Sequence, residues 1–305
     1  MSKVAVVGVG AIGGTFGVRL CASHEVTFCV RTPFERLRVE TPSGTYDEPV
    51  RCATDPSRVG KVDWVLLAVK GHQTAGAAGW LEALAGPGTV IGVLQNGVEH
   101  VERTAPFANG AEVLPMVVNC PADRLAPGRM AQNLHAGLQP LDCEAGRGLA
   151  RLFEGTDVKV TLQEDIVTAL WAKLCANLAG GPVTALTGQP RGVVRRPEIA
   201  ALARSLVREC AEAGRAAGAR LAGDIHETAV QTIIGHPPHL STSMLQDRLA
   251  GRPLEADPFT GAVIRYGLRG ASRRPHSRDE GHPPPPDGAD RGAGGGATQF
   301  RKVSC

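Results

Sequence analysis

Short apolar runs alternate with stretches of helical periodicity through the first half of the chain. The runs, which predict strands, lie at 4–7, 26–30, 62–69, 90–94 and 113–118. The helix-like stretches between them lie near 11–22, 73–84 and 98–104. This strand–helix–strand rhythm predicts a mostly parallel, doubly wound sheet of the α/β class. Shorter strands around 129–134 and 138–141, a helix over 145–155 and a strand over 157–162 complete the predicted first domain.

The periodicity becomes helical after Gln163. Glu164 and Asp165 place acidic side chains where a helix N-terminus favours them. One long amphipathic helix is predicted by apolar residues at three- and four-residue steps, namely Ile199, Leu202, Leu206, Cys210, Ala213, Ala217 and Leu221. We therefore expect a first domain over 1–163 and an all-helical domain over 164–268, with a substrate meeting a cofactor in the cleft between them.

The composition changes again after Leu268. Residues 269–305 contain four consecutive prolines and three consecutive glycines and almost no aliphatic side chains. Such a segment cannot bury enough apolar surface to order itself, so we predict a disordered tail over 269–305.

A glycine-rich loop follows the first predicted strand directly. It has the spacing G-x-G-x-x-G and consists of Gly8, Val9, Gly10, Ala11, Ile12 and Gly13. This spacing permits a tight strand-to-helix turn and brings backbone N–H groups close to a pyrophosphate. A structural glycine turn is the alternative in a chain with 38 glycines, but the preceding strand and following helix favour a Rossmann-type dinucleotide site.

Two cations beyond this loop indicate which dinucleotide is bound. Arg31 stands at the end of the second predicted strand, where NAD-binding proteins usually carry Asp or Glu. A guanidinium there can pair with a 2′-phosphate, which favours NADP(H), although a solvated surface arginine is the alternative. Lys70, just past the strand at 62–69, is a second candidate at the same sheet edge.

Composition and charge exclude several other classes of protein. The chain has 305 residues, 43% of them hydrophobic, and no apolar run approaches the ~18 to 20 residues that span a bilayer. The formal charge of +3 comes from the tail, so the body is neutral and a nucleic-acid partner is not indicated. The histidines and cysteines form no metal-binding motif, and no signal peptide precedes the first strand. We expect a cytoplasmic protein without a metal site.

The second half of the chain supplies candidate catalytic groups. Lys173 and Asn177 stand four residues apart on one helix face. Downstream, Ser243 begins a Ser-Met-Leu-Gln-Asp run and Glu255 follows it, while Asn96 comes after a strand of the first domain. Each could also be a solvated surface residue or a helix cap when taken singly.

Taken in order with the glycine loop, Arg31 and Lys70, these residues resemble the ketopantoate reductase (2-dehydropantoate 2-reductase) family over residues 3–267. The resemblance implies NADPH-dependent reduction of 2-dehydropantoate to pantoate in pantothenate biosynthesis. It implies that Lys173 is the proton donor and that Glu255 holds the lysine and favours its charged form. By the same resemblance Asn96, Asn177 and Ser243 bind a small 2-oxo acid, with Asn96 also near the nicotinamide. Whether the protein forms a homodimer stays an open question.

The chain departs from the family at two places. Gly181 stands where the family usually carries a second substrate-binding asparagine. Reduction of another 2-oxo acid, or NADP(H) binding without catalysis, therefore stays an alternative. After Gly267 the family continues into a closing apolar helix, whereas this chain enters its tail, as after a shift of reading frame. We expect the helical domain to lack its last packing element and to expose apolar surface.

Overall fold

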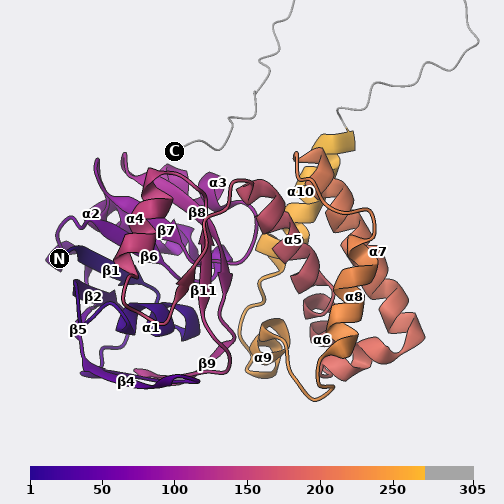
Figure 1. Cartoon of the computed structure of the whole chain (residues 1–305), viewed down its shortest axis with the longest axis horizontal. Coiled ribbons are helices and arrows are strands. Elements are labelled where there is room, and N and C mark those ends of the chain that lie inside the picture. Colours follow the sequence, from indigo (N-terminus) through magenta and orange to yellow (C-terminus); the bar gives the residue numbers. More distant parts are fainter. Residues whose placement is uncertain (272–305) are drawn as a thin grey trace, which may run out of the picture.

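Parallel strands dominate the N-terminal half of the computed structural model, which describes residues 1–271 (Figure 1). Eight strands form one sheet in the order β12-β11-β8-β7-β6-β1-β2-β5. They are β1 (Lys3–Val7), β2 (Glu25–Cys29), β5 (Arg51–Ala53), β6 (Trp64–Leu67), β7 (Val90–Val93), β8 (Glu112–Asn119), β11 (Gly137–Pro140) and β12 (Lys159–Val160). Only β8 and β11 pair antiparallel. The predicted doubly wound, mostly parallel sheet is confirmed.

Helices cover both faces of this sheet, and the buried side chains of β1 alternate between the two faces. Val4 and Val6 pack in one cluster with α1 (Ala11–Val18) and α4 (Glu144–Leu152). Ala5 and Val7 pack in another with α2 (Ala78–Leu84). The chain winds from β1 to β2 and later returns to β6 on the other side of β1. The winding therefore reverses beside β1, and such a switch point is where ligands bind in open α/β sheets.

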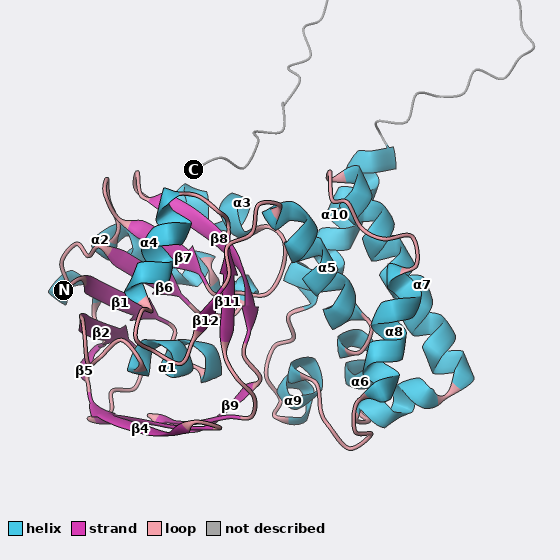
Figure 2. Cartoon of the chain, viewed as in Figure 1, coloured by secondary structure: helices cyan, strands magenta, loops and turns pink. Residues whose placement is uncertain are grey.

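A second sheet lies across α1 (Figure 2) and was only partly predicted. Its strands β4 (Gly44–Pro49), β3 (Arg36–Thr41), β10 (Arg129–Gln132) and β9 (Ala122–Ala126) pair in that order. The prediction included β10 alone. Leu37 and Val39 of β3 are fully buried while their neighbours are exposed. That alternation is the period-two signal of a half-buried strand and could have identified the β3–β4 hairpin.

Short helical turns connect the main elements of this half and of the next. They are η1 (Pro56–Arg58), η2 (Gly71–Gln73), η3 (Ala75–Ala77), α3 (His100–Thr104), η4 (Ala105–Phe107), η5 (Arg191–Arg195) and η6 (Asp257–Gly261), of which η6 has π-helical hydrogen bonding. Two of them matter for the site, because η6 packs against η2.

The C-terminal half is helical, as predicted, and its elements surround one long helix. They are α5 (Ile166–Leu178), α6 (Gly181–Thr187), α7 (Pro197–Ala216), α8 (Ile225–Gly235), α9 (Ser243–Leu249) and α10 (Ala262–Ala271). The predicted amphipathic helix is α7, against which α5, α8 and α10 pack. It ends before the predicted Leu221 because Gly218 adopts a φ of 96° and turns the chain.

The stretch from α5 into α6 has the length and apolarity of a membrane span, which the sequence analysis did not expect. Residues Ile166–Thr187 have a mean hydropathy of 1.3 over an 18-residue window. That window is 61% buried inside the protein, and α5 packs on both α7 and β8. We therefore interpret the stretch as two consecutive core helices of this half, α5 and α6.

A closing helix after Gly267 would fall mainly on 272–305, outside the described residues, so its expected loss stays a prediction; only the disorder predicted for 269–271 is wrong, because these residues continue a helix. Residues 262–271 form α10, which packs on α7 and reaches back to the first half. Tyr266 stacks edge-to-face on Trp171 at 5.3 Å, and its hydroxyl donates to Glu102 at 3.1 Å. Apolar surface is nevertheless exposed on this helix, at Ile264 and Leu268. The predicted disordered tail otherwise falls on 272–305, outside the described residues.

Replacing Tyr266 with alanine is expected to lower the free energy of unfolding by about 3 to 5 kcal/mol, as for other large buried aromatics. The side chain is only 7% exposed and links the two halves. Urea denaturation measures the loss. Ile264→Ala, on the exposed side of the same helix, is the matched control and should change stability by under about 0.5 kcal/mol. Equal effects of the two substitutions would show that α10 is not a packing element.

Candidate active site

The glycine loop turns from β1 into α1 with almost no room for side chains. Gly8 has a φ of 94°, and a Cβ there would lie 2.6 Å from the Val69 nitrogen. A Cβ on Gly13 would lie 2.1 Å from the Gly8 carbonyl oxygen. Gly10, the N-cap of α1, is different, because a Cβ there would meet no atom within 4 Å and no side chain caps the helix. The open space and free N–H groups at this helix N-terminus suit a diphosphate.

Arg31 lies just beyond the carboxyl end of β2, which is two strands away from β6 in the sheet. Its side chain is exposed, and the structure shows no hydrogen bond or ion pair for it within residues 1–271. The preceding residue, Val30, is held by a backbone hydrogen bond to Ala53 of β5. The guanidinium is therefore available to a ligand at this edge, and a role in reading a 2′-phosphate stays a prediction.

Lys70 follows β6 and is engaged by two carboxylates from the helical half. Its ammonium lies 3.0 Å from Asp247 of α9 and 3.0 Å from Glu255. Both carboxylates are buried, and Asp247 is also paired with Arg252 at 2.8 Å. Burial lowers the pKa of Lys70, but Glu255 and Asp247 outweigh this and raise it above its usual value. Lys70, predicted to bind the cofactor, therefore also links the two halves of the chain through ion pairs.

Lys173 lies on α5, where that helix packs against the end of β8. Its side chain is largely buried, and its ammonium donates to the Asn119 side-chain carbonyl at 2.7 Å. Burial lowers the pKa of Lys173 below its usual value. An ammonium that is largely buried and held by a neutral acceptor loses its proton more easily, because the described part of the chain shows no carboxylate paired with it.

The expected pairing of Glu255 with Lys173 is wrong in this structure. One Glu255 oxygen accepts from Lys70 and the other accepts from the backbone N–H of Gly71 at 3.2 Å. Glu255 leads into η6, and η6 packs against η2, so its carboxylate reaches the loop after β6. The sequence order of these residues carried no information on which lysine the carboxylate would meet.

Asn96 and Asn177 face each other across the boundary between the halves. The Asn177 amide lies 3.4 Å from the Asn96 oxygen, which joins α5 to the loop after β7. Ser243 is the first residue of α9 and is exposed, while Thr242 caps that helix. Gly181 begins α6, and a Cβ on it would meet only Met244, at 3.9 Å. The structure thus brings the two asparagines together and leaves Ser243 open to solvent.

A network of ion pairs joins the halves beside these residues. Arg265 of α10 donates two hydrogen bonds to Glu99, which is 7% exposed, and Arg103 donates two more. Asp257 of η6 pairs with both arginines at 2.7 Å. The guanidinium groups hold the Glu99 pKa below its usual value despite burial, which raises it. The network fixes α10 and η6 against the carboxyl edge of the sheet.

Three residues that make the contacts described above were not among the predicted site residues, namely Asn119, Asp247 and Glu99. Asn119 directly follows the predicted strand at 113–118, as Lys70 follows the strand at 62–69. A polar residue at the carboxyl end of a parallel strand is a signal that could have found it. Asp247 ends the Ser-Met-Leu-Gln-Asp run noted above, but its contact with Lys70 has no sequence signal because the two residues are 177 positions apart.

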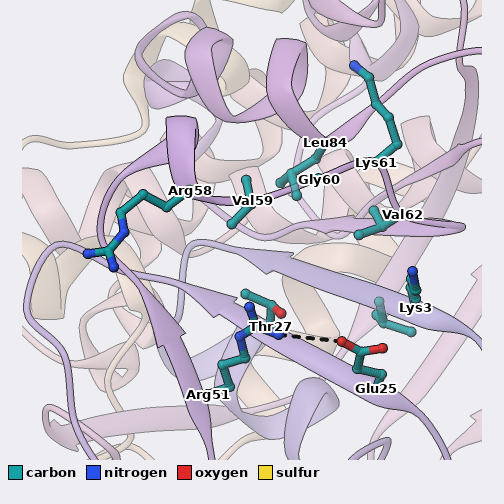
Figure 3. Close-up of a pocket in the computed structure, with 11 residues that line it drawn as sticks. Lys3, Glu25, Thr27, Arg51, Arg58, Val59, Gly60, Lys61, Val62 and Leu84 are labelled. Atoms are coloured by element: carbon teal, nitrogen blue, oxygen red, sulfur yellow. Dashed lines mark hydrogen bonds and ion pairs between the residues drawn. The ribbon is translucent and has the colours of Figure 1, made fainter.

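A groove at the opposite, amino edge of the sheet is a weaker candidate (Figure 3). Four cations line it, but they do not converge. Arg51 pairs with Glu25 at 3.5 Å, and Lys61 donates to the carbonyls of Glu82 and Ala85 at the end of α2. The groove therefore lacks a set of free groups aimed at one ligand. Within residues 1–271, no group of three potential ligands from His, Cys, Asp and Glu forms a metal site.

The fold and the site together indicate an oxidoreductase of the dinucleotide-binding class, with a lysine and amides facing the carboxyl edge of a wound sheet. Comparison with models of protein families identifies the particular family. Residues 4–143 match "Ketopantoate reductase PanE/ApbA" and residues 165–272 match its C-terminal model. The chain belongs to the ketopantoate reductase family.

Individual relatives agree with this membership. A 2-dehydropantoate 2-reductase of Caulobacter vibrioides is 42% identical over 272 residues, covering 88% of this chain and 92% of the relative. The crystal structure of a family member from Ralstonia eutropha is 33% identical, with a TM-score of 0.80 over 88% of this chain and 92% of the other. A dimeric ketopantoate reductase from Staphylococcus aureus is 27% identical, with a TM-score of 0.78 over 88% of this chain and 92% of the other.

Proposed function

We propose that this protein reduces 2-dehydropantoate to pantoate with NADPH, in pantothenate biosynthesis. The names of its relatives support this substrate. The observation that carries the proposal is the buried ammonium of Lys173, placed beside the asparagines at the carboxyl edge of the sheet. Reduction of a 2-oxo acid leaves an alkoxide, and an ammonium can both stabilise that charge and supply the proton.

The glycine loop fits the diphosphate of the cofactor. Backbone N–H groups of residues 8–13 would hold it, and Arg31 would bind the 2′-phosphate. Lys70 and Asn96 would lie near the rest of the cofactor. The Lys70 ammonium would then contact the cofactor in addition to its two carboxylate partners, Asp247 and Glu255. The reduced nicotinamide supplies the hydride.

The other side chains would bind and orient the substrate. Lys173 donates the proton at the substrate's C2 oxygen, while Asn96 and Asn177 hold the oxo acid by hydrogen bonds. Ser243, exposed at the start of α9, is available to the carboxylate of the substrate. Glu255 would act through Lys70 and Gly71, which it contacts, by fixing the loop after β6.

Loss of NADPH absorbance on addition of 2-dehydropantoate tests the reaction. We expect turnover by the purified protein. If it binds NADPH and never oxidises it with any 2-oxo acid, the chain is a cofactor-binding protein without catalysis, and the proposal fails.

A second candidate is reduction of a different 2-oxo acid, which Gly181 favours. The residue is buried and supplies no amide, and a side chain there would meet only Met244. Steady-state kinetics with a series of branched 2-oxo acids distinguishes the candidates. A higher kcat/KM for an acid other than 2-dehydropantoate would reject the first one.

Arg31→Ala is expected to weaken NADPH binding about 10- to 100-fold, because it removes charge-assisted hydrogen bonds of about 1.5 to 3 kcal/mol. NADH binding should be nearly unchanged, since NADH has no 2′-phosphate. Titration of both cofactors by fluorescence measures the two affinities. Equal losses for NADPH and NADH would show that Arg31 does not read the phosphate.

We also propose a cytoplasmic homodimer without nucleic-acid or membrane partners. The dimeric relative from Staphylococcus aureus supports the assembly. Sedimentation equilibrium measures it directly, and a monomer at all accessible concentrations would contradict it.

A further inference from the structure

The partner of the Lys173 ammonium is a neutral amide. Asn119, the last residue of β8, accepts from the Lys173 amine through its side-chain oxygen at 2.7 Å. Its backbone is fixed in the sheet, where it is in register with Gly137 of β11. The carbonyl oxygen is therefore presented from a rigid strand, while Lys173 comes from a core helix of the other half.

Several charged groups on or beside the elements packed against α5 are paired with other residues. On η6, Asp257 pairs with Arg103 and Arg265. On α8, Glu227 pairs with Arg204, and at the start of α5 Asp165 pairs with Arg220. Arg215 and Cys210 lie on α7, and Cys120 directly follows β8. Arg215 donates to the carbonyls of Leu221 and Ala222.

Two thiols beside α5, those of Cys120 and Cys210, have raised pKa values, which favours their neutral form. Burial raises the pKa of Cys120, next to Asn119, to about 12. The Cys210 pKa is raised mainly by its hydrogen bond with Cys175. Glu255, the carboxylate expected beside Lys173, is bound to Lys70 instead. Asn119 thus provides the hydrogen bond that the structure shows for the Lys173 ammonium, and it brings no negative charge.

We propose that Asn119 is a positioning residue for Lys173, which fixes the ammonium at the cleft while leaving its charge uncompensated and two of its protons free for the substrate. This inference rests on the function proposed above for Lys173. In the reaction, the C2 carbon of the oxo acid gains a hydride from NADPH, and its oxygen gains one proton from the ammonium. NADP⁺ and a neutral amine remain, and the amine takes its proton back from water.

The neutrality of the partner matters for the proton transfer. A carboxylate at the same distance would stabilise the ammonium and raise its pKa, which would weaken the acid. An apolar residue would leave the amine without a fixed position. An amide oxygen holds the group without either penalty.

Asn119→Asp is the sharpest test, because it changes the charge of the partner and almost nothing of its shape. Competitive acetylation followed by mass spectrometry, over a range of pH, measures the pKa of the Lys173 amine in the cofactor-free protein. We expect this pKa to rise by about 1 to 3 units in the variant. The alkaline limb of kcat/KM should move up in pH by the same amount, since the donor stays protonated longer.

Gln189→Glu is the matched control, because it adds the same charge at an exposed turn outside the site. It should leave both the acetylation profile and the alkaline limb unchanged. Asn119→Ala should lower kcat by up to about 100-fold through loss of position, without the upward shift of the limb.

An unchanged Lys173 acetylation profile in folded Asn119→Asp would overturn the inference. That readout needs no turnover, so it is independent of the proposed reaction. If instead Lys173→Ala kept wild-type turnover, the proposed function of Lys173 would fail, while the acetylation profile would still decide whether Asn119 controls the amine.

Discussion

Lys173→Ala is expected to lower kcat for the reduction of 2-dehydropantoate by about 10² to 10⁴-fold, the usual contribution of a positioned general acid. The substitution removes the buried ammonium that Asn119 holds beside Asn96 and Asn177. Affinity for NADPH should change little, because the glycine loop and Arg31 lie on the other half. Stopped-flow oxidation of NADPH under single-turnover conditions separates the chemical step from binding.

Lys159→Ala is the matched control, because this lysine is exposed on β12 at the far edge of the sheet. It should keep wild-type kinetics. If Lys173→Ala slowed the reaction no more than this control, Lys173 would not be the proton donor.

The same lysine makes a separate prediction for stability. Its pKa is lowered by burial from an ordinary value of 10.5, so the unfolded chain binds more protons at this site than the folded one. The contribution of Lys173 to folding is therefore unfavourable below its lowered pKa and disappears as the pH rises through the interval up to 10.5. Lys173→Met should be at least as stable as the wild type at neutral pH, and urea denaturation from pH 7 upward should show their difference shrinking.

The sheet could be predicted because its strands are buried on both faces and read as short apolar runs. Leu66 and Ile91, fully buried in β6 and β7, are typical of them. The β3–β4 hairpin was missed because only one of its faces is buried, so charged residues interrupt the apolar ones. The position of α10 could not be predicted because it depends on contacts such as Tyr266 with Glu102, 164 residues apart.

The site was predicted as a set of residues but not as a set of contacts. Lys173 and Asn177 share a helix face, and the chain alone shows this. Which carboxylate meets which lysine depends on how the two halves dock. Glu255 meets Lys70 because η6 packs on η2, and Lys173 meets Asn119 because α5 packs on β8. Docking of this kind has no local sequence signal.

Gly13→Ala is expected to lower stability and Gly10→Ala to lower NADPH affinity, although both substitutions alter the same loop. A methyl group on Gly13 would lie 2.1 Å from the Gly8 carbonyl oxygen, so the loop must deform. We expect Gly13→Ala to lose about 1 to 3 kcal/mol of stability or more, as overpacked sites do. Thermal unfolding and urea denaturation without cofactor measure the loss.

A methyl group on Gly10 would meet no protein atom within 4 Å, and its φ of −89° is accessible to alanine. Gly10→Ala should therefore unfold like the wild type. The methyl would stand in the open space at the N-terminus of α1, where a diphosphate must approach the backbone, so NADPH should bind at least about tenfold more weakly, a cost of about 1.4 kcal/mol. Isothermal titration calorimetry measures the affinity.

Gly60→Ala completes the comparison, because its methyl also meets no atom within 4 Å but lies in the groove at the amino edge of the sheet. It should match the wild type in both stability and NADPH affinity. Wild-type affinity in Gly10→Ala would mean that the diphosphate does not lie over the glycine loop. The proposed placement of the cofactor, and with it the delivery of a hydride to C2 of a substrate held beside Lys173, would then have to be abandoned.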